Sequence, residues 1–272
     1  MESTCPSILY VPTAIALLVN ESAYDDFVIF IKTLEHWNKT LPTLYIYTTC
    51  TFPEIDYNGK VVLNTCLDVY SDLTRKKMES MPSQQGLKNF FHDFTLEKCN
   101  LMSWAIATHG DGVLFCDADI CWMGPLPDIP KTTELALSPH YIRHEDEKKF
   151  GTFNAGFLYI KSQAIVEKWL LESLLSDFYE QYSLNVLAKT YSYYTFGPHI
   201  NYGWWRMFQA PVSPDQRKAE WVGLTVKGKP LVCIHTHWKT NDPMTREFNI
   251  WILNRIKSNK DFDRLSILFA SE

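Results

Sequence analysis

Short apolar runs alternate along the chain with longer segments in which apolar residues recur every three or four positions. Short runs bounded by turn residues predict buried strands. They are TAIALLVN (13–20), TLYIYTT (43–49), KVVLN (60–64), GVLFC (112–116), ELALSP (134–139), FNAGFLYIK (153–161) and LVCIHTHW (231–238). Because strands that alternate with helices favour a mostly parallel sheet covered on both faces, the pattern predicts a three-layer α/β protein.

The segments between these runs have the periodicity of amphipathic helices. One predicted helix covers residues 21–37, and a second runs from Thr95 to a stop at Gly110. Their inward faces would be formed by Phe27, Phe30, Ile31 and Leu34, and by Leu96, Cys99, Met102 and Ile106. Residues 70–92 predict a polar, partly helical surface excursion, and the charged residues 140–152 predict a mobile loop.

Three further helices are predicted in the second half of the chain. Ser162 would cap the first, and Asp177 with Glu180 has the pattern of a capping box that opens the second. Asp242 and Pro243 predict the start of the last helix. The inner faces of the first and last helices would be Ile165, Val166, Trp169 and Leu170, and Met244, Phe248, Trp251 and Ile252.

Polar residues gather at or beside the ends of several predicted strands. Asp117 and Asp119 directly follow one apolar run, and Asn154 lies in another. His235 and His237 lie two residues apart at the end of the last run, a spacing that places both on one face of a strand. Because ligands of open α/β sheets bind at the carboxyl ends of strands, we expect these residues to share one site.

The composition limits the classes of protein that fit. A chain of 272 residues with 46% apolar residues can form one large α/β domain or two small ones. A net charge of −5 argues against a broad nucleic-acid-binding face. The first apolar stretch lacks a basic flank and is broken at Pro12 and Thr13, so we expect a core strand and no membrane span. The seven cysteines form no C-x-x-C pair, which favours reduced thiols in a cytosolic setting.

Three interpretations of Asp117 and Asp119 stay open from the residues alone. Two carboxylates with an imidazole from His235 or His237 suit Mn²⁺ or Mg²⁺. A phosphatase of the haloacid dehalogenase type would use Asp117 as nucleophile, but it needs a late acidic pair where this chain has HTHWK. In the third interpretation, the aspartates form a turn below Trp122 and the histidines simply pack.

Four segments in register resemble the GT-A-fold, Asp-x-Asp glycosyltransferases that use nucleotide-diphosphate sugars. They are LFCDADICWMGPLPDI (114–129), FNAGFLYIKSQAIVEKW (153–169), EQYSLN (180–185) and CIHTHWK (233–239). The likeness is greatest to the glycogenin and lipopolysaccharide-galactosyltransferase type, and to soluble transferases of large algal viruses. It implies one Rossmann-like domain over 1–272, with a central mostly parallel mixed sheet, a nucleotide-sugar half at about 8–125 and an acceptor half at about 126–272.

The resemblance implies a metal-dependent transfer from a UDP-sugar of the xylose, galactose or glucose type to a glycan or glycoconjugate. Asp117 and Asp119 would hold Mn²⁺ or Mg²⁺ and touch the donor ribose. His235 or His237 would be the third protein ligand. Without a membrane anchor, a transferase of this kind would act in the cytosol, or in that of the host cell if a virus encodes it.

Other matching residues would bind the rest of the donor. Lys98 and Lys239 would reach the diphosphate, and Tyr24 would stack on the base. The residues near the transferred sugar or the acceptor would be Asn154, Glu180 and Gln181. Each also has a structural interpretation: Glu180 as the capping partner of Asp177, the lysines as solvated charges and Tyr24 as core. The tight Asn-Ala-Gly triplet at 154–156 suits close approach by a ligand.

The chain departs from the family pattern at two positions. Glu180 replaces an Asp, and the spacing from His235 to Lys239 is shorter than in glycogenin-like enzymes. Both departures leave the stereochemical outcome, retaining or inverting, undecided. An inverting enzyme needs a base beside the acceptor hydroxyl. The candidates are His199, Asp242, Glu180 and the acids of residues 144–147.

The aromatic residues of 191–208 offer either a platform for a sugar acceptor or a packed edge of the core. Sugars stack on aromatic faces, whereas buried aromatics pack on one another. A protein that binds nucleotide sugars without catalysis also fits the motifs. It would be stabilised by its ligand and would show no turnover.

Overall fold

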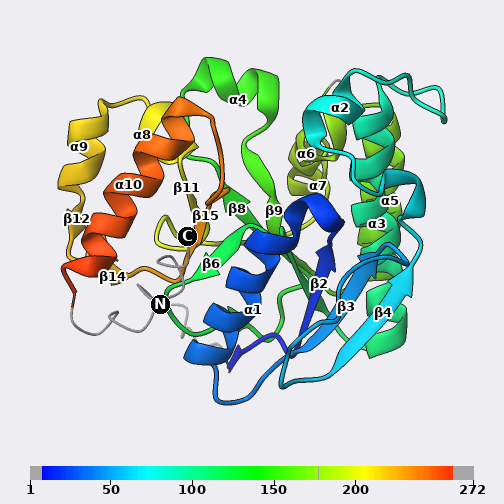
Figure 1. Ribbon diagram of the computed structural model, residues 1–272, viewed down its shortest axis with the longest axis horizontal. Helices are drawn as coiled ribbons and strands as arrows, with labels where there is room; N and C mark the ends of the chain where they lie inside the picture. The colour runs from blue at the N-terminus through cyan, green and yellow to red at the C-terminus, as the bar shows by residue number, and fades with distance from the viewer. Residues whose placement is uncertain (1–7, 177, 260–272) are drawn as a thin grey trace, which may run out of the picture.

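The computed structural model describes residues 8–176 and 178–259, and its centre is a seven-stranded sheet (Figure 1). The strands lie in the order β10–β8–β9–β5–β2–β3–β4. In that order their bounds are Tyr194–Thr195, Leu135–Pro139, Phe153–Ile160, Val113–Cys116, Ala14–Leu18, Thr43–Thr48 and Val61–Thr65. β9 is antiparallel to both its neighbours, and the other neighbouring pairs are parallel. The predicted mostly parallel mixed sheet is therefore confirmed.

Helices cover both faces of this sheet. α1 (Tyr24–Trp37), which follows the short η1 (Glu21–Ala23), packs on the face that includes Leu17 and Ile46. α3 (Phe90–His109) and α5 (Gln163–Leu174) lie against each other on the opposite face. The residues predicted for the inner face of α1 are all buried: Phe27, Phe30, Ile31 and Leu34. The three-layer α/β/α arrangement follows.

The ends of α3 show how local sequence sets a helix. Its side-chain cap is Asn89, whose Oδ1 accepts a hydrogen bond of 3.0 Å from the backbone N–H of His92. α3 therefore begins at Phe90, before the predicted Thr95. It ends as predicted at Gly110, which adopts φ 80° and donates its N–H to the carbonyl of Ile106.

A smaller region packs beside the main sheet and carries the late strand. Its elements are β6 (Ile120–Trp122), β11 (Tyr202–Gly203), β12 (Trp221–Val222), β13 (Thr225–Val226), β14 (Lys229–Pro230), β15 (Cys233–His235), α8 (Trp205–Phe208), α9 (Pro214–Ala219) and α10 (Pro243–Lys257). β15 lies between β11 and β6 and pairs His235 with Ile120. This register brings the late histidine beside the aspartates that follow β5.

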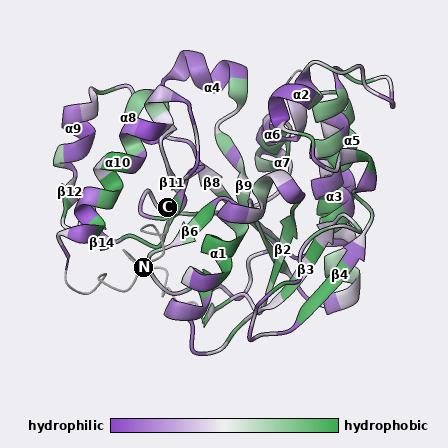
Figure 2. Ribbon diagram, viewed as in Figure 1, coloured by the Kyte–Doolittle hydropathy of each residue, from purple (hydrophilic) through white to green (hydrophobic). Residues whose placement is uncertain are grey.

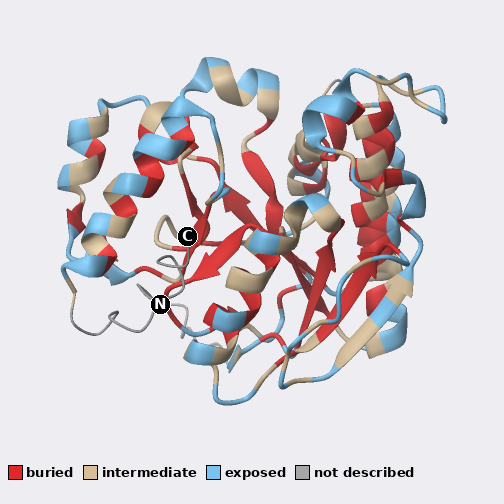
Figure 3. Cartoon of the chain, in the orientation of Figure 1, coloured by how far each residue is buried: buried red, intermediate tan, exposed pale blue. Residues whose placement is uncertain are grey.

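Short elements complete the described chain. They are β1 (Leu9–Tyr10) with β7 (Ile129–Pro130), η2 (Asp68–Tyr70), α2 (Arg75–Glu79), α4 (His144–Phe150), α6 (Tyr179–Tyr182) and α7 (Leu184–Thr190). The strands of the main sheet are apolar in Figure 2 and mostly buried in Figure 3, whereas α4 is polar and largely exposed. Within residues 8–176 and 178–259, no helix combines the length and apolar content needed to cross a membrane. The cysteines of this part of the chain are free thiols.

Several local expectations need correction. Residues 140–152, expected to be a mobile loop, contain α4, and Met244 is 44% exposed instead of facing inward. The last strand ends at His235, so His237 lies beyond it and the two histidines do not share a strand face. Asp242 caps α10 as predicted, whereas Ser162 precedes α5 without a side-chain cap bond. Asp177, the expected capping partner of Glu180, lies outside the described residues.

Candidate metal centre

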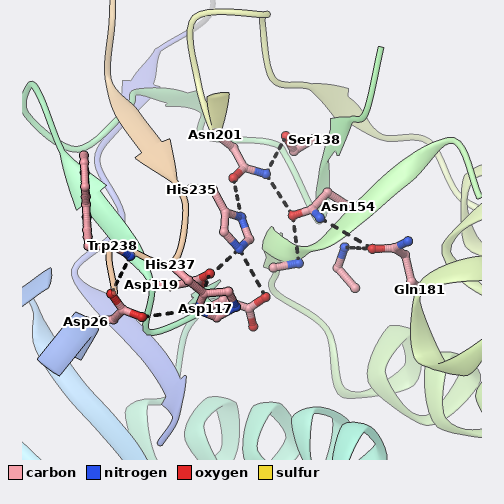
Figure 4. Close-up of polar contacts among 12 residues, drawn as sticks. Asp26, Asp117, Asp119, Ser138, Asn154, Gln181, Asn201, His235, His237 and Trp238 are labelled. Atoms are coloured by element: carbon pink, nitrogen blue, oxygen red, sulfur yellow. Dashed lines mark hydrogen bonds and ion pairs between the residues drawn. The ribbon is translucent and has the colours of Figure 1, made fainter. Parts of the chain in front are cut away.

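Two aspartates and one histidine converge at the carboxyl end of β5. The backbone N–H of Asp117 donates to the Gly156 carbonyl on neighbouring β9. The N–H of Thr236 donates to the Asp119 carbonyl, which fixes β15 against the turn. His235 Nε2 lies 3.1 Å from Asp119 Oδ1 and 3.6 Å from Asp117 Oδ2 (Figure 4). One ligand atom from each of the three residues lies within 4.8 Å of the others, a spacing that a single metal ion can span.

The local charges show why a cation belongs between these groups. Burial raises the pKa of the Asp119 carboxyl, but the neighbouring imidazoles of His235 and His237 outweigh burial and hold the pKa well below its ordinary value. Asp119 is therefore an ionised carboxylate that is 8% exposed. Buried carboxylates need a compensating charge. Two carboxylate oxygens and an imidazole nitrogen form a donor set that fits a divalent cation such as Mn²⁺ or Mg²⁺.

Gly156 leaves the space in which two of these ligands meet. A Cβ at this position would lie 2.3 Å from Asp117 Oδ2 and 2.3 Å from His235 Cε1. Both distances are far shorter than a van der Waals contact. The glycine of the Asn-Ala-Gly triplet therefore permits the approach of the ligands themselves.

The two late histidines occupy different places. His237 Nδ1 lies 3.1 Å from Asp26 Oδ2 and 3.4 Å from Asp119 Oδ2, and its side chain is 66% exposed. The charge of Asp119, with help from Asp26, raises the pKa of His237 to about 9. Asp26 also accepts the backbone N–H of Trp238. His235 completes the three-ligand group, and His237 is a cationic group at its edge.

Lys98 forms ion pairs with both Asp117 and Glu180. The Lys98 ammonium on α3 lies 3.0 Å from Asp117 Oδ1 and 2.9 Å from Glu180 Oε1. Burial lowers the pKa of Lys98, but the charges of Asp117 and Glu180 outweigh burial and raise the pKa above its ordinary value. Glu180, in α6, is buried, and its carbonyl accepts a bond from the Trp169 indole. The three side chains therefore form one ion-paired cluster beside the candidate metal ligands.

Asn154 and Gln181 lie side by side, and Gln181 follows Glu180 in α6. Asn154 Nδ2 is 3.5 Å from Gln181 Oε1, and Gln181 Nε2 donates to the carbonyl of Phe150 at the end of α4. Asn154 Oδ1 accepts the backbone N–H of Gly156 at 3.0 Å. Both predicted residues are therefore in the cluster, and both are engaged with protein groups.

Tyr24 and Lys239 lie on the α1 side of the cluster. Lys239 Nζ pairs with Asp25 Oδ2 at 3.0 Å, and both side chains are exposed. Tyr24 begins α1 and contacts the Phe52 ring edge-on, with 5.6 Å between centroids. In this structure the Lys239 ammonium is bound to an aspartate of α1, in a loop connected to His235.

The aromatic segment 191–208 is mostly a packed edge of the core. Its buried aromatic residues are Phe196, Tyr202 and Trp205. Tyr193 is 39% exposed, and Trp204 is partly exposed.

The cluster around the candidate metal ligands also includes two residues that the sequence does not predict, Asp26 and Asn201 (Figure 4). An acid in the first turn of a helix and an asparagine before a strand are common features, so the sequence contains no signal that marks either one.

The arrangement of sheet, motif and late histidine defines a GT-A, Rossmann-like α/β fold. Among solved structures, the chain is similar to galactosyltransferase LgtC, crystallised in complex with donor and acceptor sugar analogues. The TM-score is 0.57 at 14% sequence identity, over 91% of this chain and 96% of the other. No family model and no curated protein sequence matches the chain. The structural likeness confirms the fold that the sequence predicts.

Proposed function

We propose that this protein is a metal-dependent glycosyltransferase that moves a sugar from a UDP-sugar to a glycan or glycoconjugate. The observation that carries the proposal is the Asp117–Asp119–His235 group at the carboxyl end of β5. It lies in a fold shared with a galactosyltransferase whose crystal contains donor and acceptor sugar analogues. The donor sugar would be of the xylose, galactose or glucose type.

The three-residue group would hold Mn²⁺ or Mg²⁺ against the donor diphosphate. When bound, the cation supplies Lewis-acid stabilisation of the charge that develops on the leaving nucleoside diphosphate. Lys98, 3.0 Å from Asp117, adds a fixed positive charge next to that position. Lys239 would contribute a second one after leaving Asp25, and Tyr24 would contact the base.

The sugar would lie over Glu180 and Gln181. Glu180 Oε1 lies 2.9 Å from the Lys98 ammonium and the residue is 4% exposed, so its carboxyl group is held in place and shielded from water. A preorganised charge of this kind stabilises positive charge that develops at the anomeric carbon. The bond from Gln181 to the Phe150 carbonyl connects this position to α4, the helix that follows β8 and precedes β9 along the chain.

Two of the candidate bases for an inverting reaction are committed to other contacts. Asp242 caps α10 by accepting from the Thr245 N–H and hydroxyl, and Glu180 pairs with Lys98. His199 and the acids of α4 are the remaining candidates. Burial lowers the pKa of His199, with further lowering from Lys229 and Arg206, which keeps its imidazole in the basic form at neutral pH.

The late strand also favours a transferase over the phosphatase alternative. It brings His235 to the aspartates, at the place where a haloacid-dehalogenase-type enzyme would need an acidic pair. Asp117, the nucleophile in that alternative, is bound to Lys98 on one oxygen and faces His235 with the other.

A thermal-shift series with nucleoside diphosphates and UDP-sugars, each with and without Mn²⁺, tests the proposal. Stabilisation by UDP that requires Mn²⁺, followed by transfer or hydrolysis of one UDP-sugar, is the expected result. Stabilisation without turnover of any sugar would identify a binding protein. Phosphate release from a generic aryl phosphate, together with trapping of fluoroberyllate on Asp117, would establish the phosphatase instead.

A further inference from the structure

A row of buried amide side chains lies behind the metal ligand His235. Asn201 is fully buried, and its Oδ1 lies 2.8 Å from His235 Nδ1 (Figure 4). Its Nδ2 lies 3.0 Å from Asn154 Oδ1 and 3.1 Å from Ser138 Oγ. Asn201 has φ 55°, a left-handed conformation that asparagine adopts more readily than most residues. This backbone conformation places the amide between His235 and Asn154.

Backbone groups determine which way each amide points. The Gly156 N–H can only donate, and it lies 3.0 Å from the Asn154 side chain, so the oxygen of Asn154 faces it. The same oxygen lies 3.0 Å from the Asn201 amide, so Asn201 has to present its NH₂ group there. The oxygen of Asn201 therefore faces His235, and the hydrogen of their bond lies on His235 Nδ1.

The other side of Asn154 gives the same orientation independently. His140 Nδ1 lies 3.1 Å from the Gly151 carbonyl, which can only accept, so Nδ1 carries the hydrogen. His140 Nε2 is then an acceptor, and Asn154 Nδ2 lies 3.3 Å from it. The carbonyl of Gly151, acting through His140, and the N–H of Gly156 therefore determine the same orientation of the Asn154 amide.

We infer that Asn201 is a positioning residue that holds His235 with its ring proton on Nδ1 and the lone pair of Nε2 turned toward Asp117 and Asp119. The inference rests on the proposed function in that Nε2 binds the cation. Ligating histidines usually donate their other ring N–H to an oxygen, and loss of such a partner costs about 10–100-fold in metal affinity. Asn201 supplies that oxygen from a segment that the Asp-x-Asp motif does not include.

Asn154 is the anchor of this row. An asparagine side chain has two donor hydrogens and two acceptor lone pairs. The amide of Asn154 uses them on four protein groups: Gly156 N, Asn201 Nδ2, His140 Nε2 and Gln181 Oε1. Asn154 thus supports His235 through Asn201, a role different from the sugar contact that the resemblance implies.

Calorimetric titration of Mn²⁺ in the absence of nucleotide tests this role directly. Asn201→Ala removes the acceptor that faces Nδ1. We expect the alanine variant to bind Mn²⁺ about 10–100-fold more weakly than the wild type. Asn20→Ala is the matched control, because Asn20 is also buried but donates to the carbonyls of Tyr70 and Leu73. It should lose stability without a change in Mn²⁺ affinity.

The ¹⁵N spectrum of histidine-labelled wild-type protein saturated with UDP and Mg²⁺, which is diamagnetic, gives a second readout. The His235 signal, identified by its loss in His235→Asn, should show the proton on Nδ1. A proton on Nε2, or equal Mn²⁺ affinity in the wild type and in a folded Asn201→Ala, would overturn the positioning role. If the wild type binds no Mn²⁺ with or without UDP, the proposed function fails, whereas Mn²⁺ binding that Asn201→Ala leaves unchanged overturns the positioning role alone.

Discussion

Replacing Gly156 by alanine tests whether the aspartates and His235 must meet at one point. A Cβ at residue 156 would lie 2.3 Å from both Asp117 Oδ2 and His235 Cε1, whereas ordinary contacts begin near 3.4 Å. Both side chains, or the backbone of β9, therefore have to move by about 1 Å. Displacements of this size at a reacting centre cost about 10²-fold in rate. We expect Gly156→Ala to lose Mn²⁺ binding and sugar transfer together.

The same substitution should leave the fold intact. Gly156 lies inside β9 and lacks the positive φ of Gly110, so alanine fits its backbone. Overpacking typically costs about 1–3 kcal/mol, and alanine recovers part of that by restricting the unfolded chain. Gly112→Ala is the matched control, since its Cβ would meet the Tyr159 hydroxyl at 2.0 Å, away from the ligands.

Calorimetric titration of Mn²⁺ and thermal unfolding should be measured on the same preparations. The expected result is a folded Gly156→Ala without measurable Mn²⁺ affinity and a Gly112→Ala with wild-type affinity. A Gly156→Ala variant that binds Mn²⁺ as the wild type does would refute the three-ligand geometry. Equal losses in both variants would show that added bulk in the sheet, and no specific contact, is responsible.

Three further predictions concern charge. Lys98→Met leaves Glu180 buried without its partner and should lower the free energy of unfolding by about 3–5 kcal/mol; adding Glu180→Gln should restore most of that in urea titrations, and an unchanged midpoint in the single variant would contradict the pairing. Burial lowers the pKa of His140 to about 3, so the unfolded chain binds a proton below about pH 6.5 that the folded protein does not. Stability should fall as the pH drops from 6.5 toward 3, and His140→Gln should flatten that slope in denaturation series; an identical slope would count against a neutral buried His140. EDTA should abolish the stabilisation of the wild type by UDP in a thermal-shift assay, and Mn²⁺ should restore it, whereas EDTA-resistant stabilisation would argue for a site that needs no metal.

The sequence predicts the framework of this fold because apolar periodicity reflects burial directly. The local pattern alone predicts that β2 and β3 are buried strands, whose residues pack alternately on the two faces of the sheet. It also predicts the apolar face of α1. Asp117 and Asp119 were predictable as a pair because they directly follow a buried strand. The choice between His235 and His237 was not predictable, because β15 ends at His235 and the next residues turn toward Asp26.

The pattern of apolar and polar residues does not predict contacts between residues that are far apart in the sequence. Asn201 meets His235 across 34 positions and Asp26 meets His237 across 211, and neither has a local feature that predicts its partner. The sequence of α4 predicts a loop because charged residues dominate it. The apolar periodicity of α10 includes Met244 and therefore predicts that it faces inward, but the first turn of this helix is exposed. Tertiary contacts decided each of these positions.

The proposed sugar transfer depends on a cation held by Asp117, Asp119 and His235. The most direct test is the rate of UDP release from UDP-sugars by the wild type and Asp119→Ala, each with Mn²⁺ and with EDTA. We expect Mn²⁺-dependent turnover in the wild type and a loss of at least about 10²–10³-fold in a variant that stays folded. Near-normal, EDTA-resistant release of UDP by Asp119→Ala would contradict this dependence.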